Sequence, residues 1–445
     1  MDDVVAPSGR WQGRTEAGVV AFRGIRYARA ARFGKPEREP AHQGVRDARS
    51  PHATAPQLPA RLGTVMGWPE PLAQTEDCLV LSVTAPADAE PGRCAVLVWL
   101  HGGAYLTGSG EWNLYDPARL VRETGIVVVS VSYRLGVLGY LRAQGISPGN
   151  LGLLDQIAAL EWVRDNIHAF GGDPGRITVA GQSAGAHSVV AMLGIESARR
   201  LFTRAIVQSS PFGVSFQSHA AAEKAGAVFL DELDGDPATA ALPDLLAAQG
   251  RAVLRLAGPG GLNAAPPYLP VWETDPLPAQ TVWDRTVRER AGAAQVLMGC
   301  TAEEMRAFYD GPHPVFGRVR RVPVLGEPLI AAVRRIVGRK AFEDGVFRFA
   351  DLLTDAGARV YCYRFGWLHP DNPFGACHCI ELPLLFGAAT DWRDAPMVRP
   401  LSPAQLDAVG VRTRRYWGEF VRTGDVGDAA WPTHRPGSRA VHQLP

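Results

Sequence analysis

The stretch Arg176-Ile177-Thr178-Val179-Ala180-Gly181-Gln182-Ser183-Ala184-Gly185-Ala186-His187 predicts the centre of the fold. Residues 177–180 are a short apolar, β-branched run, which is typical of a buried strand. A G-x-S-x-G pattern follows at 181–185, and the small residues of 184–193 can form a helix. Strand, pattern and helix together indicate a nucleophile elbow, a turn so tight that its serine is exposed at the tip. Ser183 is therefore the candidate nucleophile.

A second G-x-S-x-G match occurs at 145–149, and its composition argues against it. Pro148 has no N–H, so it cannot supply the oxyanion donor that belongs on the residue after the nucleophile. Gly-Ile-Ser-Pro-Gly is also turn composition, and no β-branched run precedes it. We therefore interpret Ser147 as a loop residue.

The charge of the 445-residue chain is nearly balanced, with a formal net charge of +1. This balance argues against nucleic acid or an anionic membrane surface as the main partner. The acidic start of the chain shows no secretory signal, and no apolar run is long enough to span a membrane. We therefore expect a cytoplasmic protein that acts on a small molecule.

The six cysteines are at positions 78, 94, 300, 362, 377 and 379. Cys377-x-Cys379 is not a zinc-ribbon spacing, and no second cysteine pair lies at ligand distance from it. The spacing favours buried or half-buried free thiols over a metal site or a disulfide framework. The sequence thus implies no metal and no cofactor.

Apolar strand-like runs alternate with helical patterns along most of the chain. Residues 94–100 and 126–133 are nearly continuous apolar runs, which fit central strands buried on both faces. Such alternation predicts an α/β fold with a mostly parallel sheet flanked by helices. With no internal repeat and no long linker, we expect one domain over 1–445, with helical cap excursions near 212–292 and 310–350.

A serine nucleophile needs a base, and the base needs an orienting acid. In sheets of this kind the chain order is nucleophile, acid, histidine. His378 lies in a loop after the predicted strand 358–363, where it can reach back over the elbow. For the acid, Glu304 is our choice and Glu303 the alternative, since both follow a predicted strand at 295–298.

Two glycines follow the predicted buried strand 94–100, in the run His101-Gly102-Gly103-Ala104. The run is similar to the HGGG-type loop whose N–H groups complete an oxyanion hole. Gly103 and Ala104 are the expected donors, together with the N–H of Ala184.

Aromatic residues could line an apolar pocket for the substrate, because ligand pockets are mostly apolar. The candidates are Trp68, Tyr105, Trp112, Phe212 and Phe216. An apolar, near-neutral entrance suggests uncharged esters with a hydrophobic acyl or aryl group.

At this point the sequence strongly resembles the type-B carboxylesterases, the family that includes the cholinesterases. The resemblance rests on Glu76-Asp77-Cys78-Leu79, on Gly181-Gln182-Ser183-Ala184-Gly185-Ala186, and on the blocks at 149–156 and 171–174. It implies an α/β-hydrolase fold with a Ser-Glu-His triad. The triad falls on Ser183, Glu304 and His378, and the oxyanion hole on Gly103, Ala104 and Ala184.

Two departures from the family pattern concern the site and its cap. Gln182 replaces the glutamate that usually stands beside the nucleophile, and the segment between Glu304 and His378 is short for the family. A shorter segment predicts a trimmed cap and a more open gorge.

These observations predict a serine hydrolase that cleaves carboxylic esters through an acyl-enzyme, as a monomer or weak homo-oligomer. Amide, carbamate or thioester hydrolysis with the same triad is an alternative, because the leaving group leaves little trace in the motif. A non-catalytic, cholinesterase-like binding module is a second alternative, since fold alone does not determine function.

Overall fold

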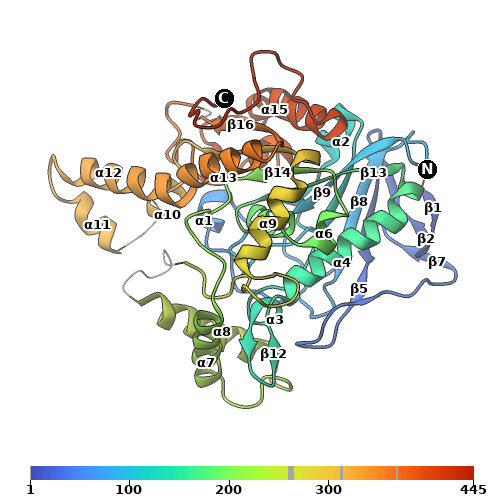
Figure 1. Ribbon diagram of the computed structural model, residues 1–445, viewed down its shortest axis with the longest axis horizontal. Helices are drawn as coiled ribbons and strands as arrows, with labels where there is room; N and C mark the ends of the chain where they lie inside the picture. The colour runs from blue at the N-terminus through green and yellow to red at the C-terminus, as the bar shows by residue number, and fades with distance from the viewer. Residues whose placement is uncertain (1, 259–264, 311–313, 367–368, 445) are drawn as a thin grey trace.

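The computed structural model describes residues 2–258, 265–310, 314–366 and 369–444. Its centre is a sheet of ten strands among these residues (Figure 1). In spatial order the strands are β17 (His442–Leu444), β16 (Arg359–Phe365), β15 (Gln295–Thr301), β14 (Arg204–Gln208), β13 (Gly172–Gln182), β9 (Cys94–Leu100), β10 (Val127–Val131), β8 (Val80–Pro86), β4 (Val19–Arg26) and β3 (Arg14–Glu16).

The sheet is parallel from β17 to β10 and antiparallel from β10 to β3. This confirms the expected mostly parallel sheet. The candidate elbow lies at its middle, since Gly181 at the end of β13 pairs with Leu100 of β9 and with Val207 of β14. In parallel sheets, ligands bind beyond the carboxyl ends of the strands, and that is the edge at which residues 101–104 and 183 emerge.

The two faces of β9 face different cores, as the period of two in a strand requires. Val96, Val98 and Leu100 belong to one buried cluster, which includes residues of α4 (Leu151–Asn166) and α5 (Ala184–Leu193). Leu97 and Trp99 belong to the other, with residues of α2 (Ala118–Thr124) and α15 (Pro403–Thr423). Burial on both faces explains why the strand reads as a continuous apolar run.

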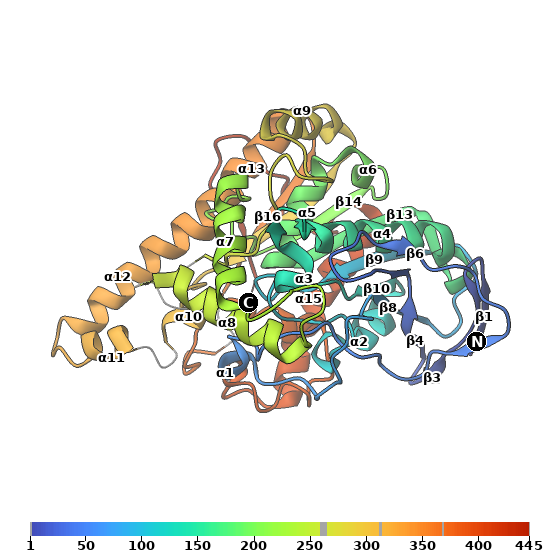
Figure 2. The ribbon, with the colours of Figure 1, turned by 90° about the horizontal axis from the view of Figure 1, so that it is seen from below.

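Two later segments are helical, and part of the second extends away from the sheet (Figures 1 and 2). The segment 212–292 contains α7 (His219–Glu232), α8 (Leu242–Ala257) and α9 (Gln280–Arg290), and the segment 310–350 contains α11 (Pro314–Arg320), α12 (Gly326–Gly338), the π-helix η5 (Arg339–Glu343) and the start of α13 (Asp344–Asp355). In both views α11 and α12 project from the body at the left. The role of both segments as a cap stays a prediction.

Short elements complete the described chain. Small sheets form from β1 (Asp3–Ala6), β2 (Gly9–Gln12) and β7 (Val45–Asp47), from β5 (Ala28–Arg29) and β6 (Glu37–Arg38), and from β11 (Arg142–Ala143) and β12 (Ser147–Pro148). The short helices are α1 (Gly63–Met66), η1 (Asn113–Tyr115), α3 (Gly136–Tyr140), η2 (Ile167–Phe170), α6 (Glu196–Arg199), η4 (Ala291–Ala293), α10 (Arg306–Tyr309), α14 (Leu382–Leu385) and η6 (Pro396–Val398). No described helix combines the length and apolar character that a membrane crossing needs. All six cysteines are free thiols, and all but the half-buried Cys94 are buried.

Candidate active site

Ser183 occupies a strained turn between β13 and α5. Its backbone has φ 56° and ψ −121°, a combination that a residue with a side chain adopts only when its surroundings impose it. A Cβ at Gly181 would come within 2.4 Å of the Gly185 carbonyl carbon, and one at Gly185 within 2.0 Å of the Leu100 carbonyl oxygen. The two glycines therefore let strand, helix and β9 approach closely enough to hold the serine in this conformation.

His378 and Glu304 form a buried hydrogen-bonded pair. Nδ1 of His378 lies 2.5 Å from Oε2 of Glu304, and both side chains are almost fully buried. The other carboxylate oxygen, Oε1, accepts a hydrogen bond of 2.7 Å from the backbone N–H of Thr301 at the end of β15. The carboxylate is thus held on both sides and fixes the orientation of the imidazole.

Glu303, the alternative acid, is occupied elsewhere. Its carboxylate pairs with Arg306 and accepts a hydrogen bond from the backbone N–H of Ala376. It contacts the loop that carries His378 rather than the imidazole itself. Of the two neighbouring carboxylates, the geometry therefore favours Glu304.

The pKa of His378 is raised well above its ordinary value. Burial opposes the charged imidazole, but the neighbouring Cys379 sulfur and the Glu304 carboxylate favour it and outweigh the burial. Burial also raises the pKa of the Cys379 thiol, which is therefore neutral near pH 7. We take the Glu304 carboxylate as the anion that sustains the raised pKa of His378.

The second imidazole nitrogen of His378 faces the elbow. Its Nε2 lies 3.1 Å from Nε2 of Gln182, the residue before the serine. The Ser183 hydroxyl and His378 line one cavity, although no hydrogen bond joins them. Catalytic hydrogen bonds are often long without substrate and tighten in the complex, so this arrangement is compatible with a serine–imidazole relay.

The loop after β9 runs directly past the serine. A Cβ at Gly102 would lie 3.2 Å from Cβ of Ser183. Gly103 and Ala104 both have positive φ, at 114° and 58°, which turns the backbone at this point. At the start of α5, Ala184 is one of the first-turn residues whose N–H groups have no partner within the helix. The three residues expected to supply oxyanion donors line the same cavity as Ser183.

Buried polar contacts hold this loop in place. Tyr133 donates a hydrogen bond of 2.7 Å to the carbonyl of His101, and the two rings stack with centroids 4.4 Å apart. Gln57 bonds both backbone groups of Gly108, at 2.8 and 3.0 Å. Burial lowers the pKa of His101 to about 4, so its imidazole is neutral and acts as a packing element rather than a second base.

A cavity of about 330 Å³ connects these groups. Among the expected substrate contacts, Tyr105 and Trp112 line it, together with Ser183, His378 and residues 102–104. Its remaining wall is largely apolar, including Met66, Val214, Leu269, Phe308 and Phe342.

Three expected contacts lie elsewhere. Trp68 is 58% exposed, and its ring lies over Gly63, where the missing side chain leaves room for it. Phe212 packs on Phe349 and Phe216 packs on His187, with ring centroids 5.5 and 4.3 Å apart. These two phenylalanines belong to the core cluster or pack against it, so aromatic composition identified only part of the cavity wall.

The wall on the His378 side comes from residues that the sequence analysis did not select. The rings of Phe308 and Phe342 each lie 5.2 Å from the imidazole, centroid to centroid. The guanidinium carbon of Arg61 lies 4.8 Å from the centre of the Phe308 ring, and Arg61 also lines the cavity. Phe342 belongs to the π-helix η5, a conformation that often occurs at functional sites.

A second buried carboxyl group lies close to the triad candidates. Glu381 is fully buried and accepts a hydrogen bond of 3.3 Å from the Ser209 hydroxyl. Burial, and then the Glu304 charge, raise its pKa to about 7, so it is partly neutral at neutral pH. The sequence held one signal for this buried carboxyl group. Glu381 is a single glutamate within an apolar run, and such a run is expected to be buried.

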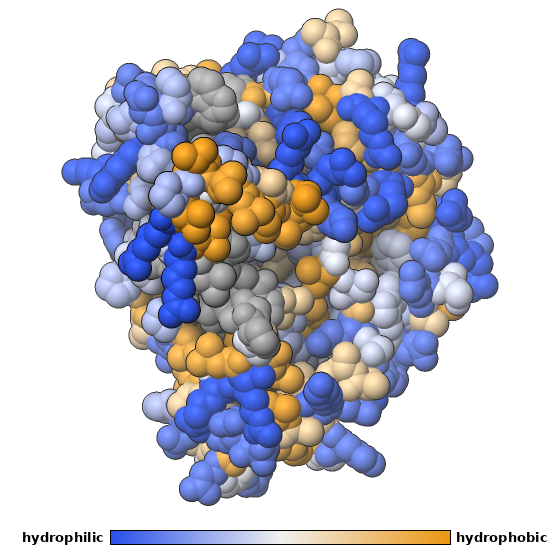
Figure 3. Space-filling view, turned by 90° about the vertical axis from the view of Figure 1, so that its left-hand side faces the viewer, coloured by the Kyte–Doolittle hydropathy of each residue, from blue (hydrophilic) through white to orange (hydrophobic). Residues whose placement is uncertain are grey.

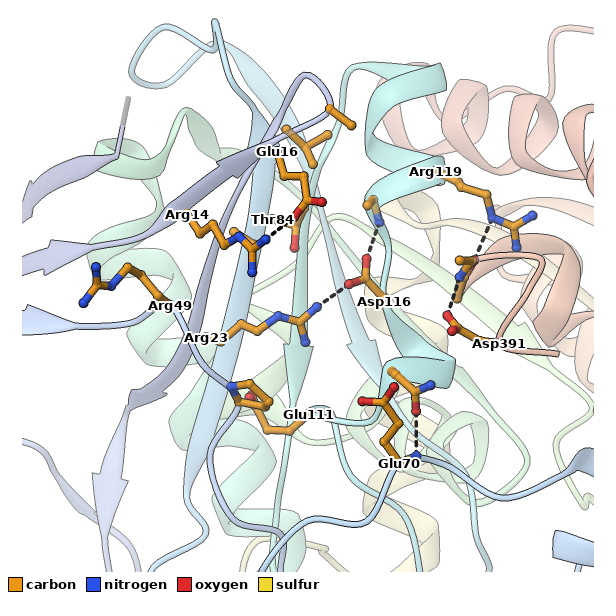
Figure 4. Close-up of a pocket in the computed structure, with 18 of the residues that line it drawn as sticks. Arg14, Glu16, Arg23, Arg49, Glu70, Thr84, Glu111, Asp116, Arg119 and Asp391 are labelled. Atoms are coloured by element: carbon orange, nitrogen blue, oxygen red, sulfur yellow. Dashed lines mark hydrogen bonds and ion pairs between the residues drawn. The ribbon is translucent and has the colours of Figure 1, made fainter.

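A second, polar cleft of about 480 Å³ lies along β3, β4 and α2 (Figure 4). Arg23 and Asp116 point toward one another across it, and Arg14 pairs with Glu16. Each arginine of the cleft contacts a carboxylate or a carbonyl: Arg14, Arg23, Arg49, Arg119 and Arg122. Its charges balance one another, and it contains none of the candidate catalytic residues.

Within the described part of the chain, no group of three or more histidine, cysteine or acidic side chains could hold a metal ion.

Apolar side chains are exposed on the face that carries α7, α8, α11 and α12 (Figure 3). The large ones on α12 and the turn before it are Val322, Val324, Leu325, Leu329 and Ile336.

The fold and the arrangement at the elbow are those of a serine hydrolase of the α/β-hydrolase class, and comparison with known proteins gives the family. A model of the carboxylesterase family matches residues 2–311, and the chain belongs to this family. It is a carboxylic ester hydrolase.

Three individual proteins are similar to this chain over nearly its whole length. A protein of Rhodococcus erythropolis described as probable N-octanoylanthranilate hydrolase AqdA2 is 58% identical over 442 residues, covering 99% of this chain and 97% of the relative. The para-nitrobenzyl esterase of Bacillus subtilis (strain 168) is 32% identical over 98% of this chain and 93% of its own length. The solved structure of a thermophilic para-nitrobenzyl esterase superposes with a TM-score of 0.84 at 30% identity, covering 99% of this chain and 95% of that one.

Proposed function

We propose that Ser183, His378 and Glu304 act as nucleophile, general base and orienting acid in ester hydrolysis. The observation that carries the proposal is the buried pair of His378 and Glu304, 2.5 Å apart, with the second imidazole nitrogen 3.1 Å from Gln182 at the elbow. A carboxylate in this position holds the tautomer and stabilises the imidazolium that forms when the serine loses its proton.

The proposed cycle has two halves. Ser183 Oγ attacks the ester carbonyl while His378 Nε2 takes its proton, and the tetrahedral oxyanion accepts hydrogen bonds from Gly103, Ala104 and Ala184. His378 then gives its proton to the leaving alcohol as the C–O bond breaks, leaving an acyl-enzyme. Water repeats the sequence and releases the acid. Each oxyanion donor contributes about 3 kcal/mol of transition-state stabilisation.

The cavity favours an apolar acyl group. Tyr105, Val214 and Leu269 line it together with the oxyanion loop, and these side chains offer apolar surface to an alkyl or aryl acyl chain. Burying each CH₂ group of such a chain contributes about 0.8 kcal/mol. We therefore expect kcat/KM to rise with acyl length until the cavity is full.

Hydrolysis of aryl amides is a second candidate, and one observation favours it. The relative that is 58% identical over almost the whole chain is described as a probable N-octanoylanthranilate hydrolase. An N-acylanthranilate has an apolar acyl chain joined through an amide to an aromatic acid. The same serine, imidazole and oxyanion donors would serve it, with His378 protonating the departing nitrogen.

A panel of acyl substrates tests both candidates. Para-nitrophenyl esters of two to twelve carbons and N-octanoylanthranilate are assayed with wild type and Ser183→Ala. We expect a loss of at least about 10⁴-fold in the variant for every substrate that wild type cleaves. A fluorophosphonate probe should modify wild type at Ser183 and leave the variant unlabelled.

Labelling at another residue, or full activity in Ser183→Ala, would contradict the assignment. Cleavage of the esters without the amide would leave only the first candidate.

We further propose a cytoplasmic, monomeric or weakly self-associating enzyme. The free state of all six cysteines supports a reducing compartment. Sedimentation over a range of concentrations would test the oligomeric state.

A further inference from the structure

We propose that Arg61 binds a carboxylate on the leaving group, so that the enzyme selects substrates whose leaving group is an aromatic acid. The inference rests on the proposed function, because it assigns one side of the same cavity to the leaving group. It goes further by naming the residue that sets specificity there.

The leaving group must lie on the His378 side of the cavity. His378 gives its proton to the departing atom, so that atom has to reach Nε2 of the imidazole. Phe308 and Phe342 flank the imidazole on this side, each with its ring centre 5.2 Å from it. Two aromatic rings beside the proton donor are suited to a flat aryl group.

Arg61 lies at the end of this aromatic surface. Its guanidinium carbon is 4.8 Å from the centre of the Phe308 ring, so it lies no farther than about 10 Å from the centre of the His378 ring. One hydrogen bond from the imidazole to the leaving atom, and one from the guanidinium to a carboxylate, each cover about 3 Å. A benzoate whose carboxylate lies beside the scissile bond can span the remaining distance.

The charges around the cavity have the sign that an anion requires. Among the described residues that line it, Arg61 is the only arginine or lysine, and none is aspartate or glutamate. The residue beside the nucleophile is Gln182, which is uncharged and lies 3.1 Å from the imidazole. Among the lining residues that the structure describes, a carboxylate that enters here therefore meets a cationic side chain and no acidic one.

The chemistry of the guanidinium also suits an anionic ligand. Arg61 as a whole residue is exposed, yet burial of its charged end lowers its pKa to about 10, against a smaller opposing effect of Tyr309. The side chain stays protonated near pH 7. Arginine binds carboxylates through two parallel N–H groups, and such bidentate pairs are stronger than neutral hydrogen bonds.

Matched substrates test the proposal. N-octanoylanthranilate is compared with its methyl ester at the aromatic carboxylate, and 2-(octanoyloxy)benzoate with phenyl octanoate. The readout is the ratio of kcat/KM for the charged over the uncharged partner. In wild type we expect the charged partner to be preferred, and in Arg61→Met we expect the ratio to fall at least about ten-fold.

The controls separate charge from fold. Arg288→Met removes the same charge from an exposed position on α9 that lines none of the cavities described above, and should leave the ratio unchanged. Arg61→Lys keeps the charge without the planar fork and should give an intermediate ratio. An unchanged ratio in Arg61→Met would overturn the proposal.

A test on wild type alone covers the case in which Arg61→Met does not fold. Anthranilate should inhibit phenyl octanoate hydrolysis more strongly than its primary amide, and added salt should weaken that preference. Equal inhibition by acid and amide would overturn the proposal. If wild type cleaves neither phenyl octanoate nor N-octanoylanthranilate, the proposed function fails instead, and the two failures are thereby distinguished.

Discussion

Two walls enclose the cavity at Ser183, and they are constructed differently. The first comes from the carboxyl ends of β9, β13 and β15, and its groups are held by buried hydrogen bonds and glycine contacts. The second comes from a loop at Arg61, from α10 and from η5, and its groups meet through ring contacts. Chemistry that needs atoms fixed within fractions of an ångström belongs on the first wall, whereas the choice of substrate can be left to the second.

If this contrast holds, the largest effect should follow from one atom of the first wall. Glu304→Gln keeps the shape of the side chain but removes the charge that orients and stabilises His378. We expect kcat to fall about 10³–10⁴-fold in a steady-state ester assay. Glu303→Gln is the matched control and should change kcat less than about three-fold, because that carboxylate forms a partly exposed ion pair with Arg306. Similar losses in both variants would contradict the assignment of the acid.

A smaller effect is expected from the oxyanion loop. Gly103→Ala would place a Cβ 2.1 Å from the Thr107 carbonyl oxygen, at a residue with φ 114°, so the loop has to move. We expect kcat to fall about 10²–10³-fold with little change in KM. Gly145→Ala provides the control, since its φ is also positive but no atom lies within 4 Å of the added carbon. A Gly103→Ala enzyme with normal kcat would remove this loop from the mechanism.

The pH dependence of kcat/KM tests the protonation of His378, which belongs to the same catalytic arrangement as Glu304. His378 accepts a proton only when neutral, and its pKa is raised above the ordinary 6.5. Activity should therefore appear as pH rises through a midpoint above 6.5. In Glu304→Gln the residual activity should titrate at lower pH, because the partner anion is gone. A wild-type midpoint below 6.5 would contradict the described electrostatics.

The smallest effects should separate the cavity lining from the outer surface. Trp112→Ala removes an aromatic ring from the cavity, and we expect KM for aryl esters to rise several-fold. Trp68→Ala removes a ring that is largely exposed and outside the cavity lining, and KM should change less than about two-fold. A larger rise in KM for Trp68→Ala than for Trp112→Ala would contradict this prediction. It would mean that Trp68 contacts the substrate, as the sequence analysis expected.

The first wall could be predicted from the sequence and the second could not. The strand 94–100 and the helix 184–193 have the bounds that their apolar and small-residue patterns indicated, because burial on both faces or close packing leaves a clear composition. His378 follows a strand, as its place in the chain suggested. The elbow strand is longer than its apolar run, since β13 begins at Gly172.

The second wall left no such pattern in the sequence. Arg61 lies in a proline-rich loop, and its reach depends on the path of that loop rather than on any period. Phe308 and Phe342 look like ordinary helical core residues. Phe212 and Phe216 look the same, yet they pack away from the cavity. The tail at 442–444 adds a strand to β16, because backbone pairing at a sheet edge needs no apolar run.

The π-helix η5 between α12 and α13 has a consequence for how such a pocket can change over generations. A π turn accommodates one residue more than the α-helix around it. Loss of a single codon there would restore the regular helix and turn one flank by about 100° relative to the other. Phe342 would then leave the imidazole while every strand kept its register. Insertions and deletions, and not only substitutions, are thus a route by which descendants of this gene could acquire new substrates.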